Sequence, residues 1–289
     1  MVTSRALAVT CMALLGAGVT ACGGAASTAA TGLQEAPAAR VTTVSTAPAS
    51  AGRTPVGAAA APEAAPEAAP EPLAGKVIVI DPGHNGGNHR DPKAINKQVN
   101  VLTQWKACDT TGTATNNGYS EAAFTWDVSR RLAKILRAEG ATVKLTRDGN
   151  SGVGPCITQR AAIGNQAHAD AAVSVHADGA AAQSRGFHVI MPEKIGGPVD
   201  PVVGKSRKLG IALRDAYRAG TGLPYSTYIG KNALDYRDDL GGLNLSTVPK
   251  VFIETGNMRN AADASRLTNA AFRQRIAESL AKGLRDYLG

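Results

Sequence analysis

The segment that most constrains the fold of this chain is Lys-Val-Ile-Val-Ile-Asp-Pro-Gly-His, at residues 76–84. Four consecutive apolar residues, rich in β-branched side chains, predict a short strand that is buried on both faces. Asp81, Pro82 and Gly83 end this strand and leave His84 at its carboxyl end. Ligands bind at that end of the strands in open α/β sheets, so His84 is a candidate functional residue.

Two later segments have the same design. The apolar residues 171–175 are followed at once by His176, and residues 251–253 are followed at once by Glu254. Each of the three predicted strands therefore presents one side chain that can bind a metal or transfer a proton. Because parallel strands end at the same edge of a sheet, we expect these side chains to contribute to one site.

The order of the predicted elements indicates the fold class. Further strands are expected at residues 142–146 and 186–191, and helices at residues 121–139, 158–168, 201–219 and 269–288. Strands and helices alternate, which predicts a single α/β domain with a largely parallel central sheet flanked by helices on both faces. Residues 85–118 form a long polar loop in this scheme, and the glycine-rich residues 220–247 form an irregular wall of a cleft.

The first 74 residues have a different composition. Residues 1–21 combine one Arg with an apolar run that is too short for a membrane span, which predicts an export signal. Residues 23–72 contain 18 Ala and 7 Pro, so residues 22–74 are expected to be a disordered tether. Cys22 follows Val-Thr-Ala and is a candidate for lipidation; ordinary cleavage near Ala21 fits the same residues. The catalytic domain would then span residues 75–289.

Charge and cysteine content bound the surroundings of this domain. The chain has a formal net charge of +8, which would hold an exported domain near anionic envelope polymers. We find no basic helix, zinc-finger spacing or aromatic-basic motif, so nucleic acid is not an expected partner. Cys108 and Cys156 are an isolated pair that most simply forms a disulfide outside the cell, where it could stabilise the fold by roughly 4 kcal/mol.

The residue types at two predicted strand ends and at the start of a predicted helix suit a catalytic zinc site. Such sites commonly use three protein ligands and leave a position for water, and His84, Glu121 and His176 satisfy that rule. Zn²⁺ makes a bound water more acidic and polarises a carbonyl, and Glu254 could carry the proton to a leaving amine. Glu121 lies in the first turn of the predicted helix, and taken alone it would be explained better by a favourable interaction with the helix dipole.

The same residues carry a resemblance to a known family. The segments Val-Ile-Asp-Pro-Gly-His84-Asn-Gly-Gly, Ser-Glu121-Ala, Thr-Arg147-Asp, Ser-Val-His176-Ala-Asp and Phe-Ile-Glu254-Thr-Gly resemble the zinc-dependent N-acetylmuramoyl-L-alanine amidases of the third amidase family. The resemblance extends over nearly all of residues 75–289. It implies zinc on His84, Glu121 and His176, with Glu254 as the catalytic carboxylate. It also implies cleavage of the amide between N-acetylmuramic acid and L-alanine of the stem peptide.

Two other functions fit parts of this pattern. One is a catalytically silent protein of the same fold that binds peptidoglycan or regulates another enzyme, and the other is a zinc peptidase that cuts within the stem peptide. In each case the expected partner is peptidoglycan or its muropeptide fragments. We expect an exported monomer in the cell envelope or periplasm, which contacts the membrane only through a lipid on Cys22 if that residue is modified.

Overall fold

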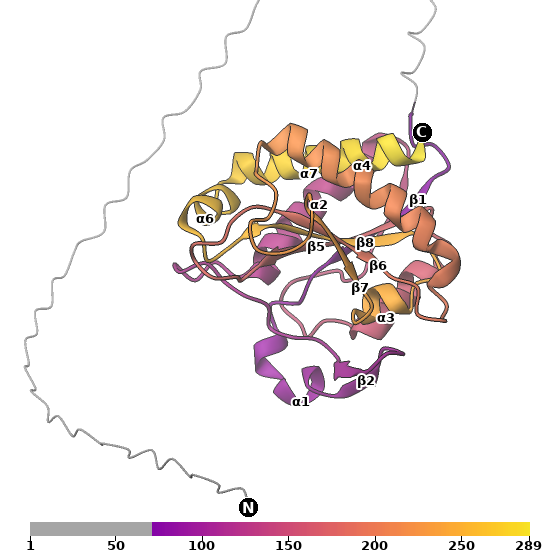
Figure 1. The fold of residues 1–289 in the computed structure, drawn as a ribbon, viewed down its shortest axis with the longest axis horizontal. Helices are drawn as coiled ribbons and strands as arrows, with labels where there is room; N and C mark the ends of the chain where they lie inside the picture. The colour runs from indigo at the N-terminus through magenta and orange to yellow at the C-terminus, as the bar shows by residue number, and fades with distance from the viewer. Residues whose placement is uncertain (1–70) are drawn as a thin grey trace, which may run out of the picture. The chain divides into compact units, whose positions relative to one another are not determined.

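The computed structural model describes residues 71–289, which form a six-stranded sheet. The sheet lies between layers of helices (Figure 1). Its strands stand in the order β4-β1-β5-β8-β6-β7. All neighbouring pairs are parallel except β6 with β8, which is antiparallel. The strands are β1 (Val77–Pro82), β4 (Thr142–Leu145), β5 (Ala171–Asp178), β6 (His188–Pro192), β7 (Leu234–Arg237) and β8 (Lys250–Asn257). The predicted single α/β domain with a largely parallel sheet is confirmed.

The three strands that carry the candidate residues are neighbours in the centre of this sheet. Strand β5 lies between β1 and β8, and all three run in the same direction. His176 and Glu254 are direct partners in the β5–β8 register, and Pro82 is the partner of Val175. The strand order therefore brings His84, His176 and Glu254 to one edge of the sheet.

Helices cover both faces of the sheet, as predicted. Helices α2 and α4 pack on one face and α7 packs on both of them, whereas α3 lies on the other face (Figure 1). The helices are α1 (Pro92–Ile95), α2 (Glu121–Ala138), α3 (Ile157–Gln166), α4 (Val203–Thr221), α5 (Gly241–Asn244), α6 (Ala261–Leu267) and α7 (Ala270–Leu288), with 3₁₀ turns η1 (Asn88–Arg90) and η2 (Asp200–Val202).

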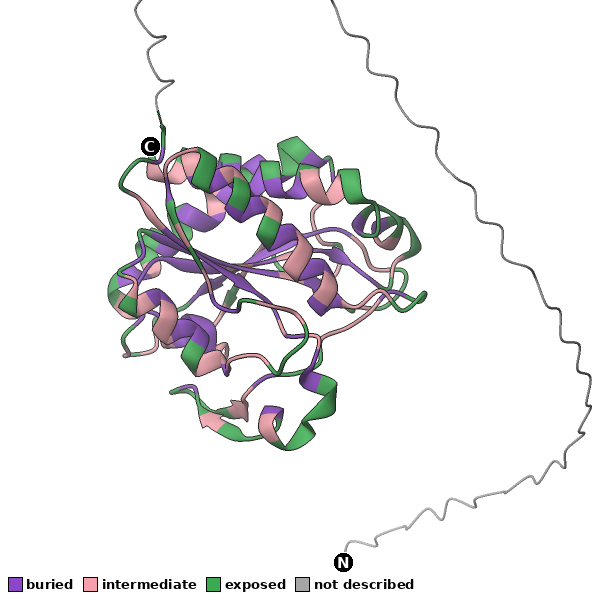
Figure 2. Cartoon of the chain, turned by 180° about the vertical axis from the view of Figure 1, so that it is seen from behind, coloured by how far each residue is buried: buried purple, intermediate pink, exposed green. Residues whose placement is uncertain are grey.

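Side chains along each strand point alternately to the two faces of the sheet, and each face packs against its own helices. Ile78 and Ile80 of β1 point into the large core under α2, α4 and α7, while Val79 packs against Ile163 of α3 on the other face. The strands in the middle of the sheet are consequently buried on both sides (Figure 2). This explains why their sequences are continuous apolar runs rather than alternating ones.

Helix α2 is built to place its first residue against the sheet. The Ser120 hydroxyl caps it by accepting a hydrogen bond from the Ala123 amide, and serine is a preferred residue at this position. Phe124, Val128 and Leu132 form a fully buried stripe that fixes the rotation of the helix. Glu121 at the start of the helix shares the inward side and is only 4% exposed.

Two segments that were expected to be irregular contain short regular elements. Residues 85–118 include α1 and a hairpin of β2 (Gln98–Asn100) and β3 (Trp105–Ala107), and residues 220–247 include β7 and α5. These elements depend on contacts between the two segments. The Asn244 side chain donates to the Val101 carbonyl at 2.9 Å, and the Thr103 hydroxyl donates to the Asp238 carbonyl at 2.7 Å.

The predicted export signal, the tether over residues 22–74 and the lipidation candidate Cys22 lie almost wholly outside the described residues. Those assignments, and the limits of the domain, stay predictions. Within residues 71–289, no helix has the length and apolar character that crossing a bilayer requires.

Candidate metal site and catalytic cleft

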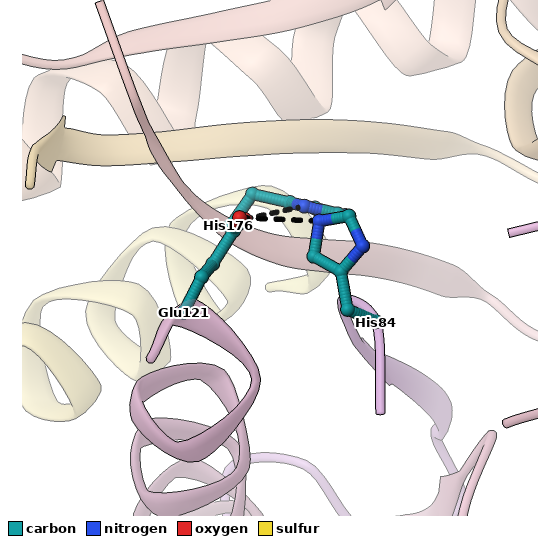
Figure 3. A group of neighbouring side chains, drawn as sticks. All are labelled: His84, Glu121 and His176. Atoms are coloured by element: carbon teal, nitrogen blue, oxygen red, sulfur yellow. Dashed lines mark hydrogen bonds and ion pairs between the residues drawn. The ribbon is translucent and has the colours of Figure 1, made fainter. Parts of the chain in front are cut away.

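His84, Glu121 and His176 come together although 37 and 55 residues separate them along the chain. One ligand atom from each lies within 4.8 Å of the other two. The Glu121 carboxylate lies between the two imidazoles, with one oxygen 3.2 Å from His84 Nε2 and the other 3.0 Å from His176 Nδ1 (Figure 3). Two imidazoles and a carboxylate at these separations form a set of donors that suits a transition-metal ion.

Glycines allow this close approach. Gly83 precedes His84, and a Cβ atom there would lie 2.3 Å from the His176 ring. Gly112 has a φ of +73°, and a Cβ atom there would lie 2.7 Å from both Glu121 Oε2 and His84 Cδ2. His84 itself has a φ of +56°, which is uncommon for a residue other than glycine. The backbone around the three residues is thus shaped to let their side chains meet.

The His84 ring is oriented by the loop that follows β3. Its Nδ1 lies 3.1 Å from the Thr110 carbonyl and 3.4 Å from Asp109 Oδ1, which leaves Nε2 toward the site. Burial by itself lowers the pKa of His84, but the negative charges of Glu121 and Asp109 and their hydrogen bonds raise it to about 10. A metal-binding histidine usually donates a hydrogen bond from its other ring nitrogen to a carbonyl or carboxylate oxygen, which fixes the orientation of the ring.

Glu121 is held by backbone amides from two directions. The Thr113 amide donates to Oε2 at 3.0 Å, and the Ala177 amide donates to Oε1 at 3.2 Å. Burial alone would raise the pKa of Glu121, but His84 and His176 lower it far below the ordinary value, so this group is a carboxylate. Its inward position therefore has a partner in the site, and an interaction with the helix dipole is not needed to explain it.

The aromatic ring of Phe252 supports His176. The two rings are stacked, with 5.2 Å between their centroids and 13° between their planes. Phe252 lies two residues before Glu254 on β8, so both side chains point to the same face of the sheet. Strand β8 therefore supports the His176 ring through Phe252 and also supplies Glu254 next to it.

Glu254 lines a cavity of about 310 Å³ together with His84, Glu121 and His176. Its Oε2 atom is buried and has no hydrogen-bond partner among residues 71–289. Burial and the negative charges of Glu121 and Asp178 raise the pKa of Glu254 well above its ordinary value. A carboxyl group with an unused oxygen beside a candidate metal site is suited to exchanging protons with a bound substrate.

Two buried arginines hold the ends of these elements in place. Arg147 donates to the carbonyls of Pro82 and Ala122, which joins the end of β1 to the start of α2. Arg160 donates to the His84 carbonyl and to the carboxylates of Asp81 and Asp109. Both side chains are used entirely inside the protein, so they act as scaffolding for the site.

The sequence predicted the three metal-binding candidates and Glu254 but missed their supports. Asp109 and Thr110 lie within a long polar loop, and no local pattern distinguishes them from its other polar residues. Asp81 lies only three residues before His84 in the sequence, but it is paired with Arg160 and Lys250, at 2.9 and 3.0 Å.

Cys108 and Cys156 are near neighbours but carry free thiols. The Ile157 amide donates to the Cys108 carbonyl at 2.8 Å, which joins the loop after β3 to the start of α3. Burial and a hydrogen bond with the Cys156 thiol raise the pKa of Cys108 to about 12. The two residues thus lie close together, and the disulfide stays a prediction.

Comparison with known proteins decides the family. The model of the family described as N-acetylmuramoyl-L-alanine amidase matches residues 78–286. This chain belongs to that amidase family. Membership confirms the predicted activity, which is hydrolysis of peptidoglycan by an N-acetylmuramoyl-L-alanine amidase. The amidase family is metal-dependent, and His84, Glu121 and His176 are the candidate metal site of this amidase.

Individual relatives agree with this assignment. The amidase is 39% identical over 218 residues to N-acetylmuramoyl-L-alanine amidase Rv3717 of Mycobacterium tuberculosis. The aligned region covers 75% of this chain and 88% of the relative. Among solved structures, the amidase Ami1 of Mycobacterium smegmatis is 37% identical and covers 75% of this chain and 98% of its own, with a TM-score of 0.71. The apo form of Ami1 from Mycobacterium abscessus is 41% identical, covers 75% and 100% of the two chains, and has the same TM-score.

Proposed function

We propose that this amidase holds one zinc ion between His84, Glu121 and His176 and uses Glu254 as its catalytic carboxylate. The observation that carries the proposal is that the three donors meet within 4.8 Å beside the unpartnered oxygen of Glu254. Two histidines, a glutamate and an open position match the composition of catalytic zinc sites. The Thr110 carbonyl and the buried Asp109 carboxylate, which contact the far nitrogen of His84, provide the support that such ligands need.

The reaction hydrolyses the amide bond between the lactyl group of N-acetylmuramic acid and L-alanine. Zinc at this site would polarise the lactyl carbonyl and acidify the attacking water. Glu254 removes a proton as the water oxygen bonds to the carbonyl carbon, and then delivers a proton to the alanine nitrogen as the carbon–nitrogen bond breaks. A zinc ion held by the three ligands would offset the negative charge of Glu121. The pKa of Glu254 would then fall, which favours the charged carboxylate that the first step needs.

Digestion of purified muropeptides by the full-length protein, with mass detection of the products, tests this assignment. We expect intact N-acetylmuramic acid and a complete stem peptide beginning with L-alanine. Peptide fragments that lack alanine would instead indicate a peptidase acting within the stem, and the absence of any product would indicate a silent binding protein. Full activity of the Glu254→Ala variant would remove Glu254 from the mechanism.

Metal content provides an independent test of the ligands. We expect about one zinc ion per chain in the wild-type protein and far less in the His84→Ala, Glu121→Ala and His176→Ala variants. His89→Ala is a matched control because His89 is exposed on η1, and this variant should retain its zinc. Loss of zinc in the control, or its retention in the ligand variants, would contradict the proposed ligand set.

We also propose that the protein is exported and works as a monomer in the cell envelope or periplasm. The predicted signal over residues 1–21 and the peptidoglycan substrate of the family support export. A lipid on Cys22 and a disulfide between Cys108 and Cys156 are further proposals, the second supported by the closeness of the two thiols. Mass analysis of the mature protein, before and after reduction, tests both modifications.

A further inference from the structure

Arg237 ends strand β7 and lines the same cavity as Glu254 and the three candidate metal ligands. About a third of its side chain, 34%, remains exposed. From the sequence, residues 220–247 around Arg237 are predicted only to form an irregular wall of a cleft. Within residues 71–289, this guanidinium group makes no hydrogen bond to Glu254 or to the three candidate metal ligands.

The hydrogen bonds of Arg237 leave part of the group available. Its Nε and Nη2 atoms donate to the two oxygens of Asp239, both at 2.6 Å. Among residues 71–289, its Nη1 atom has no hydrogen-bond partner. Arginine presents five N–H donors in a rigid fork, so donors remain for a second acceptor.

The local charge balance favours an anionic group as that acceptor. Lys106 of β3 donates to the same Asp239 carboxylate at 2.9 Å, so two cations share one anion. Lys106 also lines an adjoining cavity of about 190 Å³, which has His84, His176 and Phe252 in common with the first one. Asp235 and Glu254 also lie near enough to Arg237 to raise its pKa, but among residues 71–289 only Asp239 is hydrogen-bonded to the guanidinium group.

We propose that Arg237 is a specificity-determining residue that binds a carboxylate of the stem peptide beyond the scissile amide. The proposal rests on the amidase activity at the neighbouring site. The only carboxyl group of N-acetylmuramic acid is consumed in the scissile amide, so a substrate carboxylate in the cleft must belong to the peptide. A guanidinium group recognises a carboxylate through paired, charge-assisted hydrogen bonds, which fix the direction of the peptide as well as its affinity.

A pair of substrates that differ only in charge tests this role. We would compare N-acetylmuramoyl-L-alanyl-D-glutamate with its diamide, which has the same shape and no carboxylate. The wild-type protein should cleave the acid with kcat/KM about tenfold or more above that of the diamide, mainly through KM, because hydrogen bonds between charged groups are the strong ones. Equal values for the two substrates would overturn the proposal.

Variants connect the preference to Arg237. In Arg237→Gln the ratio of kcat/KM for the acid to kcat/KM for the diamide should fall to nearly one, whatever the change in the absolute rate of either substrate. Arg237→Lys retains the charge without the fork and should give an intermediate ratio. Arg275→Gln is the matched control, because Arg275 is exposed on α7 and lines neither cavity, and it should behave as the wild type. A preference that persists in Arg237→Gln contradicts the proposal.

Binding of the product peptide separates this inference from the proposed chemistry. Calorimetry with L-alanyl-D-glutamate and its diamide should show the same preference in the wild-type protein and its loss in Arg237→Gln. This readout needs no turnover, so it decides the role of Arg237 even if neither substrate is cleaved. If Arg237→Gln does not fold, the same comparison with Arg237→Lys must show a reduced preference for the acid.

Discussion

The protein contains two groups of buried charges that lie a few residues apart and behave differently. In the first group, Asp81 is paired with Arg160 and Lys250 and accepts further hydrogen bonds from Thr146 and Ser174. In the second group, Glu254 and the three candidate metal ligands face a cavity, and one oxygen of Glu254 has no partner.

The contrast shows how a structural site differs from a functional one. Around Asp81, burial alone would raise its pKa, but the charges of Lys250 and Arg160 lower it well below the usual value. Around Glu254, burial and like charges act together and raise the pKa. Buried charges whose polar atoms all have partners stabilise the fold, whereas a carboxyl group with an unpartnered oxygen beside a cavity retains the capacity to react.

The largest expected effect is on catalysis. Glu254→Gln retains the size of the side chain and removes its ability to exchange protons, so muropeptide hydrolysis should fall by roughly 10²–10⁴-fold. Because Glu254 contributes an unpartnered oxygen to the fold, the melting temperature should change little. Steady-state kinetics and thermal unfolding of the same preparation measure both quantities. A large loss of stability would place Glu254 among the structural charges instead.

Asp81→Asn should produce the opposite result. It leaves Arg160 and Lys250 buried, at 4% and 2% exposure, without their shared anion. Removing one partner of a buried ion pair typically costs about 3–5 kcal/mol, so the free energy of unfolding should fall by that amount. Denaturant titration measures it. A change below about 1 kcal/mol would mean that this cluster does not stabilise the fold.

Acid should weaken the same cluster over a defined range. The pKa of Asp81 is lowered on folding, so its stabilisation is fully present above about 3.8, the pKa of an ordinary aspartate. Below that value the unfolded chain takes up a proton that the folded protein does not. The difference in unfolding free energy between wild type and Asp81→Asn should therefore shrink by up to about 1.4 kcal/mol per pH unit. A difference that stays constant from pH 5 to pH 3 would contradict this assignment.

The smallest effect is expected at an exposed pair. Lys282 and Asp286 lie on α7 with their side chains 56% and 44% exposed, and their closest atoms are 2.7 Å apart. Lys282→Ala should change the free energy of unfolding by no more than about 0.5 kcal/mol. This variant is the reference for the Asp81 measurement, since it removes a charge pair that differs mainly in burial.

Local sequence patterns explain which features of the fold and the site could be predicted, and long-range contacts explain which could not. The strand ends at His84, His176 and Glu254 follow apolar runs, and Ser120 caps a helix with a clear apolar stripe, so local patterns were enough. The hairpin β2–β3 and strand β7 were missed because contacts such as Asn244 with Val101 join segments 143 residues apart. The position of Asp109 behind His84 and the role proposed for Arg237 could not be predicted for the same reason, because both depend on neighbours that only the folded chain supplies.

The most direct test of the central claim is a crystal structure of the zinc-loaded protein with anomalous diffraction data collected at the zinc absorption edge. The account predicts one strong anomalous peak about 2.0–2.2 Å from a nitrogen of His84, a nitrogen of His176 and an oxygen of Glu121. Glu254 should lie beside this peak without binding the metal. A zinc peak at other residues, or none between these three, would contradict the account.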